Sequence, residues 1–176
     1  IALFGVSMTS QANRQRFIRS ITYMVGGEEA IEISNADNLD DSDREEEFAR
    51  VEIENDLNCK YPVFMYRPSN FILSDYTVYE ESQAAFVEYM YQDQVMVLYI
   101  TKSDEEFTNY LLHQGEIKER LEISNEQIKM EVTERMDEDD KQPSYVAHWI
   151  YDNCFYDISG KMEKEEFIKF LENIRF

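Results

Sequence analysis

Two pairs of apolar segments, each joined by a very short polar connection, constrain the fold of this chain more than any other feature. Residues 84–91 and 94–101 are rich in aromatic and β-branched side chains, as are residues 145–151 and 155–159. The second connection contains Asp152-Asn153, a pair that tolerates the positive φ angles of tight turns. Strands joined by such short turns are antiparallel. The sequence therefore predicts two β-hairpins in an antiparallel sheet.

Helices are expected before and after this strand-rich stretch in the sequence. Ser42 and Glu45 have the spacing of a capping box and predict a helix over 43–57. The apolar residues of that segment, Phe48 among them, fit the helix and strand periods almost equally. The segment 163–174 carries an apolar stripe at helical spacing, which has to be buried against another surface. We expect that surface to be one face of the sheet.

The remaining expected elements complete an α+β fold. They are helices at 7–25 and 107–112 and strands at 29–34, 62–67, 71–79, 116–123 and 127–135. The predicted fold class is α+β, with a mainly antiparallel sheet of about six to eight strands. An N-terminal helix, a second helix and a C-terminal amphipathic helix pack on this sheet. Residues 1–27 are expected to form a membrane-proximal segment and the first helix, and residues 28–176 a single domain.

The first six residues, Ile1 to Val6, are all apolar or small. A chain that continues from a membrane span would begin in this way, and a buried terminal strand is the alternative. Three arginines follow at 14, 16 and 19, and residues 1–27 contain no acidic residue. The rest of the chain therefore accounts for more than the whole net charge of −20. So negative a domain repels nucleic-acid phosphate, and we expect no nucleic-acid partner.

The chain has two cysteines, Cys59 and Cys154, and no CxxC motif. A disulfide between them would require an oxidising compartment. The sequence favours the other interpretation, in which each is a small apolar residue at the end of an element.

No motif in the sequence predicts catalysis, a cofactor or a metal site. It contains no phosphate-binding glycine loop, no nucleophile elbow and no HExxH pair. The two histidines, His113 and His148, are expected on different elements. The acidic segment 37–43 fails the EF-hand pattern at the ligand and glycine positions. We therefore expect a non-enzymatic domain without a cofactor or metal.

Aromatic residues on the predicted strands are the candidate ligand face, because an exposed aromatic strip stacks on sugar rings or peptides. The alternative, which the sequence favours, is that these rings fill the core. The candidates are Tyr89, Tyr91, Tyr99, Trp149, Tyr151 and Tyr156.

Two stretches resemble known proteins. Met8 to Arg14 resembles the membrane-proximal segment of a set of Gram-positive bacterial membrane proteins. The run Ala147 to Gly160, with Met162 and the helix at 163–174, resembles the family called domain of unknown function 4367. In that family a Trp-containing strand, a tight turn, an aromatic strand and an amphipathic helix close the domain. Tyr66-Arg67-Pro68 and the aromatic hairpins fit the same pattern, whereas the two cysteines depart from it.

The resemblance implies the outer part of a single-span membrane protein with a short inner segment, similar to anti-sigma factors. The implied location is the extracytoplasmic face, with a membrane anchor upstream and a regulatory partner inside the cell. It implies no catalytic residues. The three arginines at 14, 16 and 19 argue against this outer location, because positive charge near a span favours the cytoplasmic side. They fit the outer location if they contact lipid headgroups.

Three hypotheses follow from these observations. The preferred one is a sensory or regulatory ectodomain that relays its state through a span. The second is a cell-envelope module that binds glycan or peptide on the aromatic face. The third is a hydrolase with a dispersed site, and it ranks last because the chain has two histidines and no nucleophile motif.

Overall fold

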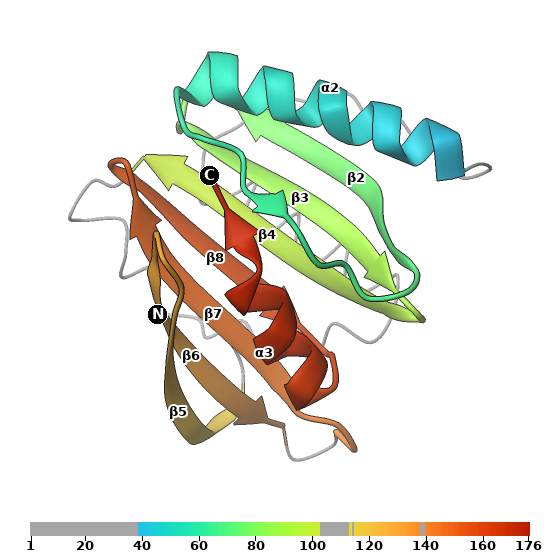
Figure 1. The fold of residues 1–176 in the computed structure, drawn as a ribbon, viewed down its shortest axis with the longest axis vertical. Coiled ribbons are helices and arrows are strands. Elements are labelled where there is room, and N and C mark those ends of the chain that lie inside the picture. Colours follow the sequence, from blue (N-terminus) through green and yellow to red (C-terminus); the bar gives the residue numbers. More distant parts are fainter. Residues whose placement is uncertain (1–38, 103–112, 114, 138–139) are drawn as a thin grey trace.

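The computed structural model describes residues 39–102, 113, 115–137 and 140–176 (Figure 1). The helices expected at 7–25 and 107–112 and the strand expected at 29–34 lie outside these residues, as does the boundary at residue 27. The described elements are α2 (Leu39–Leu57), β1 (Val63–Phe64), β2 (Phe71–Tyr79), β3 (Ala84–Tyr91), β4 (Gln94–Lys102), β5 (Glu116–Ser124), β6 (Lys129–Met136), β7 (Ser144–Tyr151), β8 (Cys154–Gly160), α3 (Lys164–Glu172) and β9 (Ile174–Arg175).

Seven strands form one antiparallel sheet in the order β2-β3-β4-β8-β7-β6-β5, and β1 and β9 form a separate two-stranded sheet. Both predicted hairpins are present, as β3-β4 and β7-β8. Asp152 and Asn153 have φ values of 47° and 60°, so both turn residues are left-handed. Two such residues give a turn whose twist matches that of the flanking strands. The predicted α+β class with a mainly antiparallel sheet is confirmed.

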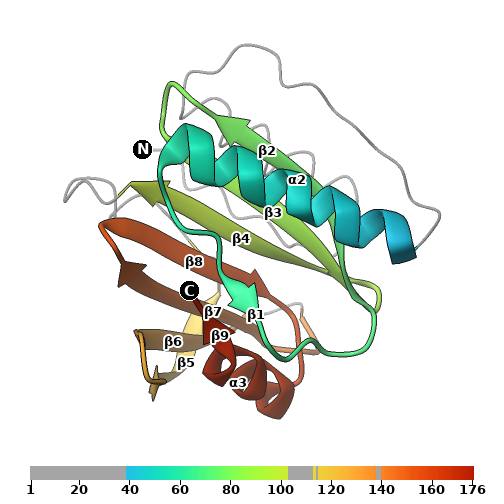
Figure 2. The same cartoon turned by 45° about the horizontal axis from the view of Figure 1, so that its top comes forward.

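The two helices and the β1-β9 sheet lie on the same side of the seven-stranded sheet (Figures 1 and 2). They enclose the main core, to which α2 contributes Ile53 and Leu57 and α3 contributes Phe167 and Phe170. The opposite side of the sheet carries a second, smaller cluster that includes Phe86. The described part of the chain therefore forms two layers, with one face of the sheet under α2, α3 and the β1-β9 sheet.

The segment 43–57 is helical because its buried residues follow the helix period. Ala49, Ile53 and Leu57 are fully buried at intervals of four residues, whereas Phe48 and Val51 are 61% and 45% exposed. A strand would have placed Val51 and Ile53 on one face, so tertiary burial decides between the two periods.

Two predicted elements are shorter than expected. The strand predicted at 62–67 contains only Val63 and Phe64, and it pairs with β9 instead of the main sheet. The chain then turns away at Pro68, which has no N–H for a strand ladder. The closing helix ends at Glu172, because Ile174 and Arg175 extend to form β9. In the described part of the chain, neither helix has the length and apolar character needed to cross a bilayer.

Candidate functional site

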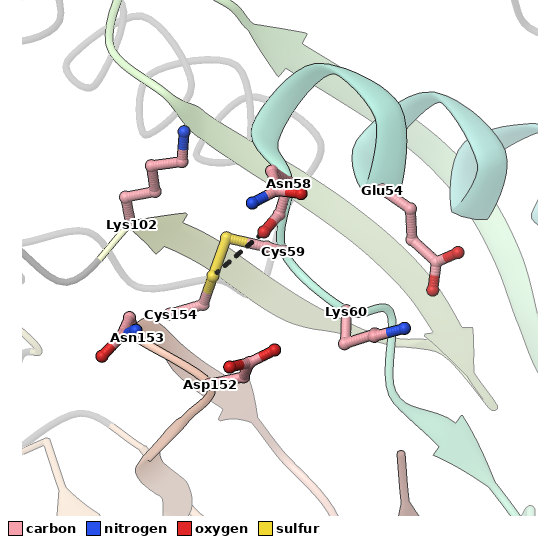
Figure 3. Close-up of a pocket in the computed structure, with 8 residues that line it drawn as sticks. All are labelled: Glu54, Asn58, Cys59, Lys60, Lys102, Asp152, Asn153 and Cys154. Atoms are coloured by element: carbon pink, nitrogen blue, oxygen red, sulfur yellow. Dashed lines mark hydrogen bonds between the residues drawn. A yellow bond between two sulfur atoms is a disulfide. The ribbon is translucent and has the colours of Figure 1, made fainter.

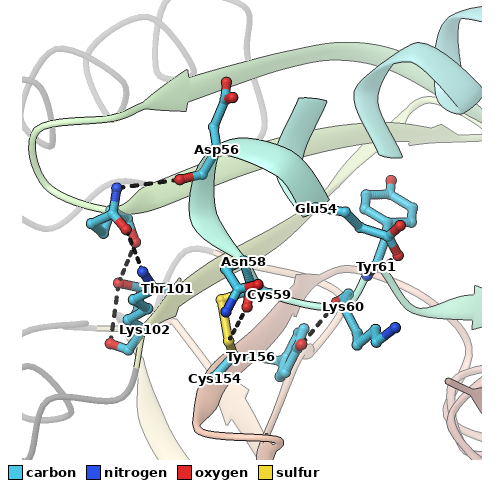
Figure 4. Close-up of a disulfide and its surroundings, with 11 residues drawn as sticks. Glu54, Asp56, Asn58, Cys59, Lys60, Tyr61, Thr101, Lys102, Cys154 and Tyr156 are labelled. Atoms are coloured by element: carbon cyan, nitrogen blue, oxygen red, sulfur yellow. Dashed lines mark hydrogen bonds between the residues drawn. A yellow bond between two sulfur atoms is a disulfide. The ribbon is translucent and has the colours of Figure 1, made fainter. Parts of the chain in front are cut away.

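A disulfide joins Cys59, just after α2, to Cys154, the first residue of β8 (Figure 4). Their Cα atoms are 5.8 Å apart, and 95 positions separate them in the sequence. Asn58 has a left-handed φ of 51°, which ends the helix and turns Cys59 toward the sheet. Both cysteines lie at element ends, as expected. The preference for unpaired thiols was wrong, because the fold brings two distant element ends together.

A pocket of about 420 Å³ lies beside this disulfide (Figure 3). Its lining residues come from the end of α2, the end of β4 and the β7-β8 turn: Glu54, Asn58, Cys59, Lys60, Lys102, Asp152, Asn153 and Cys154. The two carboxylates and two amines of this set balance in charge. The two cysteines are each only 2% exposed. The lining of the pocket therefore carries no net formal charge, and the disulfide is its distinctive chemical group.

Hydrogen bonds reinforce the covalent link between α2 and the sheet (Figure 4). The Tyr156 hydroxyl donates to the Lys60 carbonyl oxygen at 2.8 Å. The Gln83 side-chain amide donates to the Asp56 carbonyl oxygen at 3.4 Å, and Lys102 donates to the amide oxygen of Gln83 at 2.7 Å. The C-terminal end of α2 is thus attached to β8 and to the start of the β3-β4 hairpin.

A partly buried ion pair, in which Glu46 is buried and Arg67 is about one-third exposed, attaches the first half of α2. Arg67 donates two hydrogen bonds, of 2.6 and 2.7 Å, to the carboxylate oxygens of Glu46, which is 7% exposed. The Tyr89 hydroxyl donates to the same carboxylate at 2.9 Å and also contacts the Tyr61 hydroxyl. Burial, followed by the charge of Glu46, raises the pKa of Tyr61. A paired carboxylate and two neutral phenols therefore satisfy one another beneath α2.

The fold brings both histidines to Asp157, on the sheet face opposite the helices. His113 Nε2 lies 2.9 Å from Asp157 Oδ2. His148 on β7 is the cross-strand neighbour of Asp157 on β8, and its Nε2 lies 3.4 Å from a carboxylate oxygen of Glu131. The sequence placed these histidines on separate elements and gave no sign that they would meet. Within the described ranges, no cluster of His, Cys, Asp and Glu has the arrangement of a metal site.

The six candidate aromatics do not form an exposed strip. Tyr89, Tyr91, Trp149 and Tyr156 are buried in the core under the helices, where Tyr151 also packs at its margin. Tyr99 lies in the second cluster, on the other face of the sheet. The rings of Trp149 and Tyr156 stack at 5.4 Å from centroid to centroid. These rings therefore fill the core clusters, which is the alternative that the sequence favoured, because alternate residues of each strand face the same cluster.

Sequence reasoning also missed the Glu46–Arg67 pair. Arg67 stood out only as part of Tyr66-Arg67-Pro68, and Glu46 is one of 37 acidic residues. The signal available for the disulfide was the presence of only two cysteines in a chain expected outside the cytoplasm.

The fold and the covalent link define an antiparallel α+β domain with a helix fastened to its sheet. A profile of the family described as Domain of unknown function (DUF4367) matches residues 61–174, which run from just before β1 into β9. The chain belongs to this family. Helix α2 and Cys59 precede the matched residues, so the disulfide joins the family domain to the helix before it. Neither the curated proteins nor the solved structures contain a significant match.

Proposed function

We propose that this chain is the extracytoplasmic regulatory domain of a membrane-anchored bacterial protein, similar to anti-sigma factors, and that it acts by binding. The observation that carries the proposal is the Cys59–Cys154 disulfide. Structural disulfides persist outside the reducing cytoplasm. The strongly negative net charge suits a domain that must stay soluble near an envelope surface.

The attachment of α2 supports a relay role. Helix α2 connects residues 1–38 to the family domain, and it is anchored by the disulfide at one end and by Glu46 in its first half. A helix held at two places moves with the sheet as one body. Movement of the sheet would therefore be transmitted toward the preceding segment and, in this proposal, through an upstream span to a cytoplasmic partner.

The location is tested by thiol labelling in intact bacterial cells that express the full-length natural protein. Cells are treated with a membrane-impermeant maleimide of high mass, before and after addition of a membrane-impermeant reductant. We expect a gel shift by two labels only after reduction. A Cys59→Ser/Cys154→Ser variant should show no shift, and a cytoplasmic thiol protein should remain unlabelled throughout.

Free cysteines that react only after cell lysis, without any reductant, would place the domain in the cytoplasm. That result would overturn the extracytoplasmic proposal.

A further inference from the structure

The sheet face opposite the helices carries a groove of about 580 Å³ over β5 to β8. Its position follows from the strand register, in which Arg120, Thr133 and Val146 are successive cross-strand neighbours on β5, β6 and β7. In a neighbouring row, two residues along the strands, His148 on β7 pairs with Asp157 on β8. A groove of this size falls within the range of small-molecule sites.

One end of the groove is rich in positive charge, which is unusual in a chain with a net charge of −20. Arg120 and Arg135 line this end, whereas Lys129 lies at the start of β6, toward Ile150. Both histidines and the acidic residues Glu131 and Asp157 also line the groove. Lys129 pairs with Glu122 outside the groove, and the two acids of the groove contact the histidines. The arginines are therefore the cations that remain for a ligand.

Among the described residues, neither Arg120 nor Arg135 forms an ion pair with a carboxylate. The Arg135 guanidinium donates to the His113 carbonyl oxygen at 2.7 Å, and the exposed Arg120 has no hydrogen-bond partner in the described ranges. Burial, and then the charge of Arg120, lowers the pKa of Arg135, and the charge of Asp157 partly offsets this decrease. An anion between the two guanidinium groups would relieve this repulsion and accept their hydrogen bonds.

The other end of the groove carries apolar side chains beside Lys129, whose amine pairs with Glu122. Ile150 is 58% exposed, and its cross-strand neighbour is Phe155. Ile150 lies four residues along β7 from Val146, which corresponds to about 13 Å of strand. The charged and apolar ends are thus separated by roughly the length of a short alkyl chain or a small aromatic acid.

We propose that this groove binds a small amphiphilic anion, whose carboxylate or phosphate head lies between Arg120 and Arg135 and whose apolar body covers Ile150 and Phe155. This inference goes beyond the proposed regulatory function and does not depend on it. Binding is measured on the purified 176-residue chain, so its outcome is independent of the cellular location.

The experiment is calorimetric titration with octanoate and octyl phosphate, together with NMR mapping of backbone amides. We expect saturable binding of at least one anion, with shifts concentrated in β5 to β8, and weaker binding of octanol and inorganic phosphate. The stronger of the two anions identifies the head group. Arg120→Gln should weaken binding about tenfold, because one charge-assisted interaction is lost.

The matched control is Arg44→Gln, which removes the same charge from the exposed surface of α2 and should leave binding unchanged. Ile150→Ser should weaken both amphiphiles without affecting inorganic phosphate. Equal binding by wild type and Arg120→Gln, equal binding of octanol and octanoate, or no binding of either anion at millimolar concentration would overturn the proposal.

Discussion

Glu46 shows how a single residue connects helix and sheet in this protein. Its carboxylate is almost inaccessible, yet it receives hydrogen bonds from Arg67 and Tyr89, which come from different parts of the fold. A buried carboxylate without such donors would be strongly destabilising. The pair therefore fixes how α2 lies on the sheet, and its contribution depends on both partners being present.

Replacing Arg67 by alanine should lower the free energy of unfolding by about 1–3 kcal/mol, because Glu46 would stay buried with fewer donors. Urea denaturation measures the change. Arg50→Ala is the control, since Arg50 pairs with Glu47 on the exposed side of the same helix and should have little effect. The double variant Glu46→Gln/Arg67→Ala should be less destabilised than the sum of the single variants. If the free-energy changes of the two single variants simply added up in the double variant, this would contradict the coupling between Glu46 and Arg67.

Tyr145 provides a pH-dependent prediction. Burial, and then the charge of Glu134, raises the pKa of Tyr145 to about 12, above its usual value near 10. When the pKa of a group is higher in the folded state than in the unfolded state, its contribution to stability is fully present at pH values below the unfolded pKa. That contribution is lost as the pH rises through the folded pKa. Stability should therefore fall between about pH 10 and 12. Tyr145→Phe should make this fall shallower in urea titrations, and an identical slope would argue against the raised pKa.

At the scale of elements, short turns and burial have different roles. The hairpins follow from local sequence, because two-residue connections leave the strands only antiparallel pairing. The identity of α2 follows from burial, since Ile53 and Leu57 face the core and Phe48 does not. The end of α3 is set by pairing, because β9 takes Ile174 into a ladder with Phe64.

Gly160 at the end of β8 is the element-scale position most sensitive to a side chain. Its φ is +155°, and a Cβ would lie 2.8 Å from the Val95 carbonyl oxygen and in contact with the Met96 sulfur. Gly160→Ala should therefore lower the free energy of unfolding by about 1–3 kcal/mol, because the start of β4 would have to shift. Thermal and urea unfolding measure the change, and an unaltered midpoint would show that β4 moves without cost.

At the scale of the whole molecule, the disulfide closes a loop that contains most of the sheet. Cross-linking residues so far apart removes many unfolded conformations, and such bonds typically contribute about 2–5 kcal/mol. Cys59→Ser/Cys154→Ser should lower the free energy of unfolding by that amount in urea denaturation. Addition of dithiothreitol should destabilise the wild type similarly and leave the variant unchanged. Equal stability of reduced and oxidised wild type would contradict this.

The local sequence was sufficient for the fold class, both hairpins and most of the closing helix, whereas burial decided that the segment 43–57 is helical. Periodicity and turn residues act over a few positions, so a linear pattern contains them. The capping box predicted at Ser42 was wrong as the start of the helix, because α2 already begins at Leu39. The family resemblance, carried by the closing strands and helix, is confirmed by the match over residues 61–174. Local pattern was too long for the strand predicted at 62–67, because only Val63 and Phe64 pair with β9, about 110 residues away in the chain. It favoured the core for the candidate aromatics but did not assign each ring to one face of the sheet.

The tertiary structure alone decided which distant residues meet. Cys59 reaches Cys154, Glu46 reaches Arg67, and His113 reaches Asp157 only after the strands have adopted their order. It also decided that Tyr89 and Trp149 are core residues and that the arginines of β5 and β6 line a groove. The physical reason is that these contacts depend on strand order and on which face each register exposes. Neither is encoded within a short window, because both arise from burying the whole apolar surface at once.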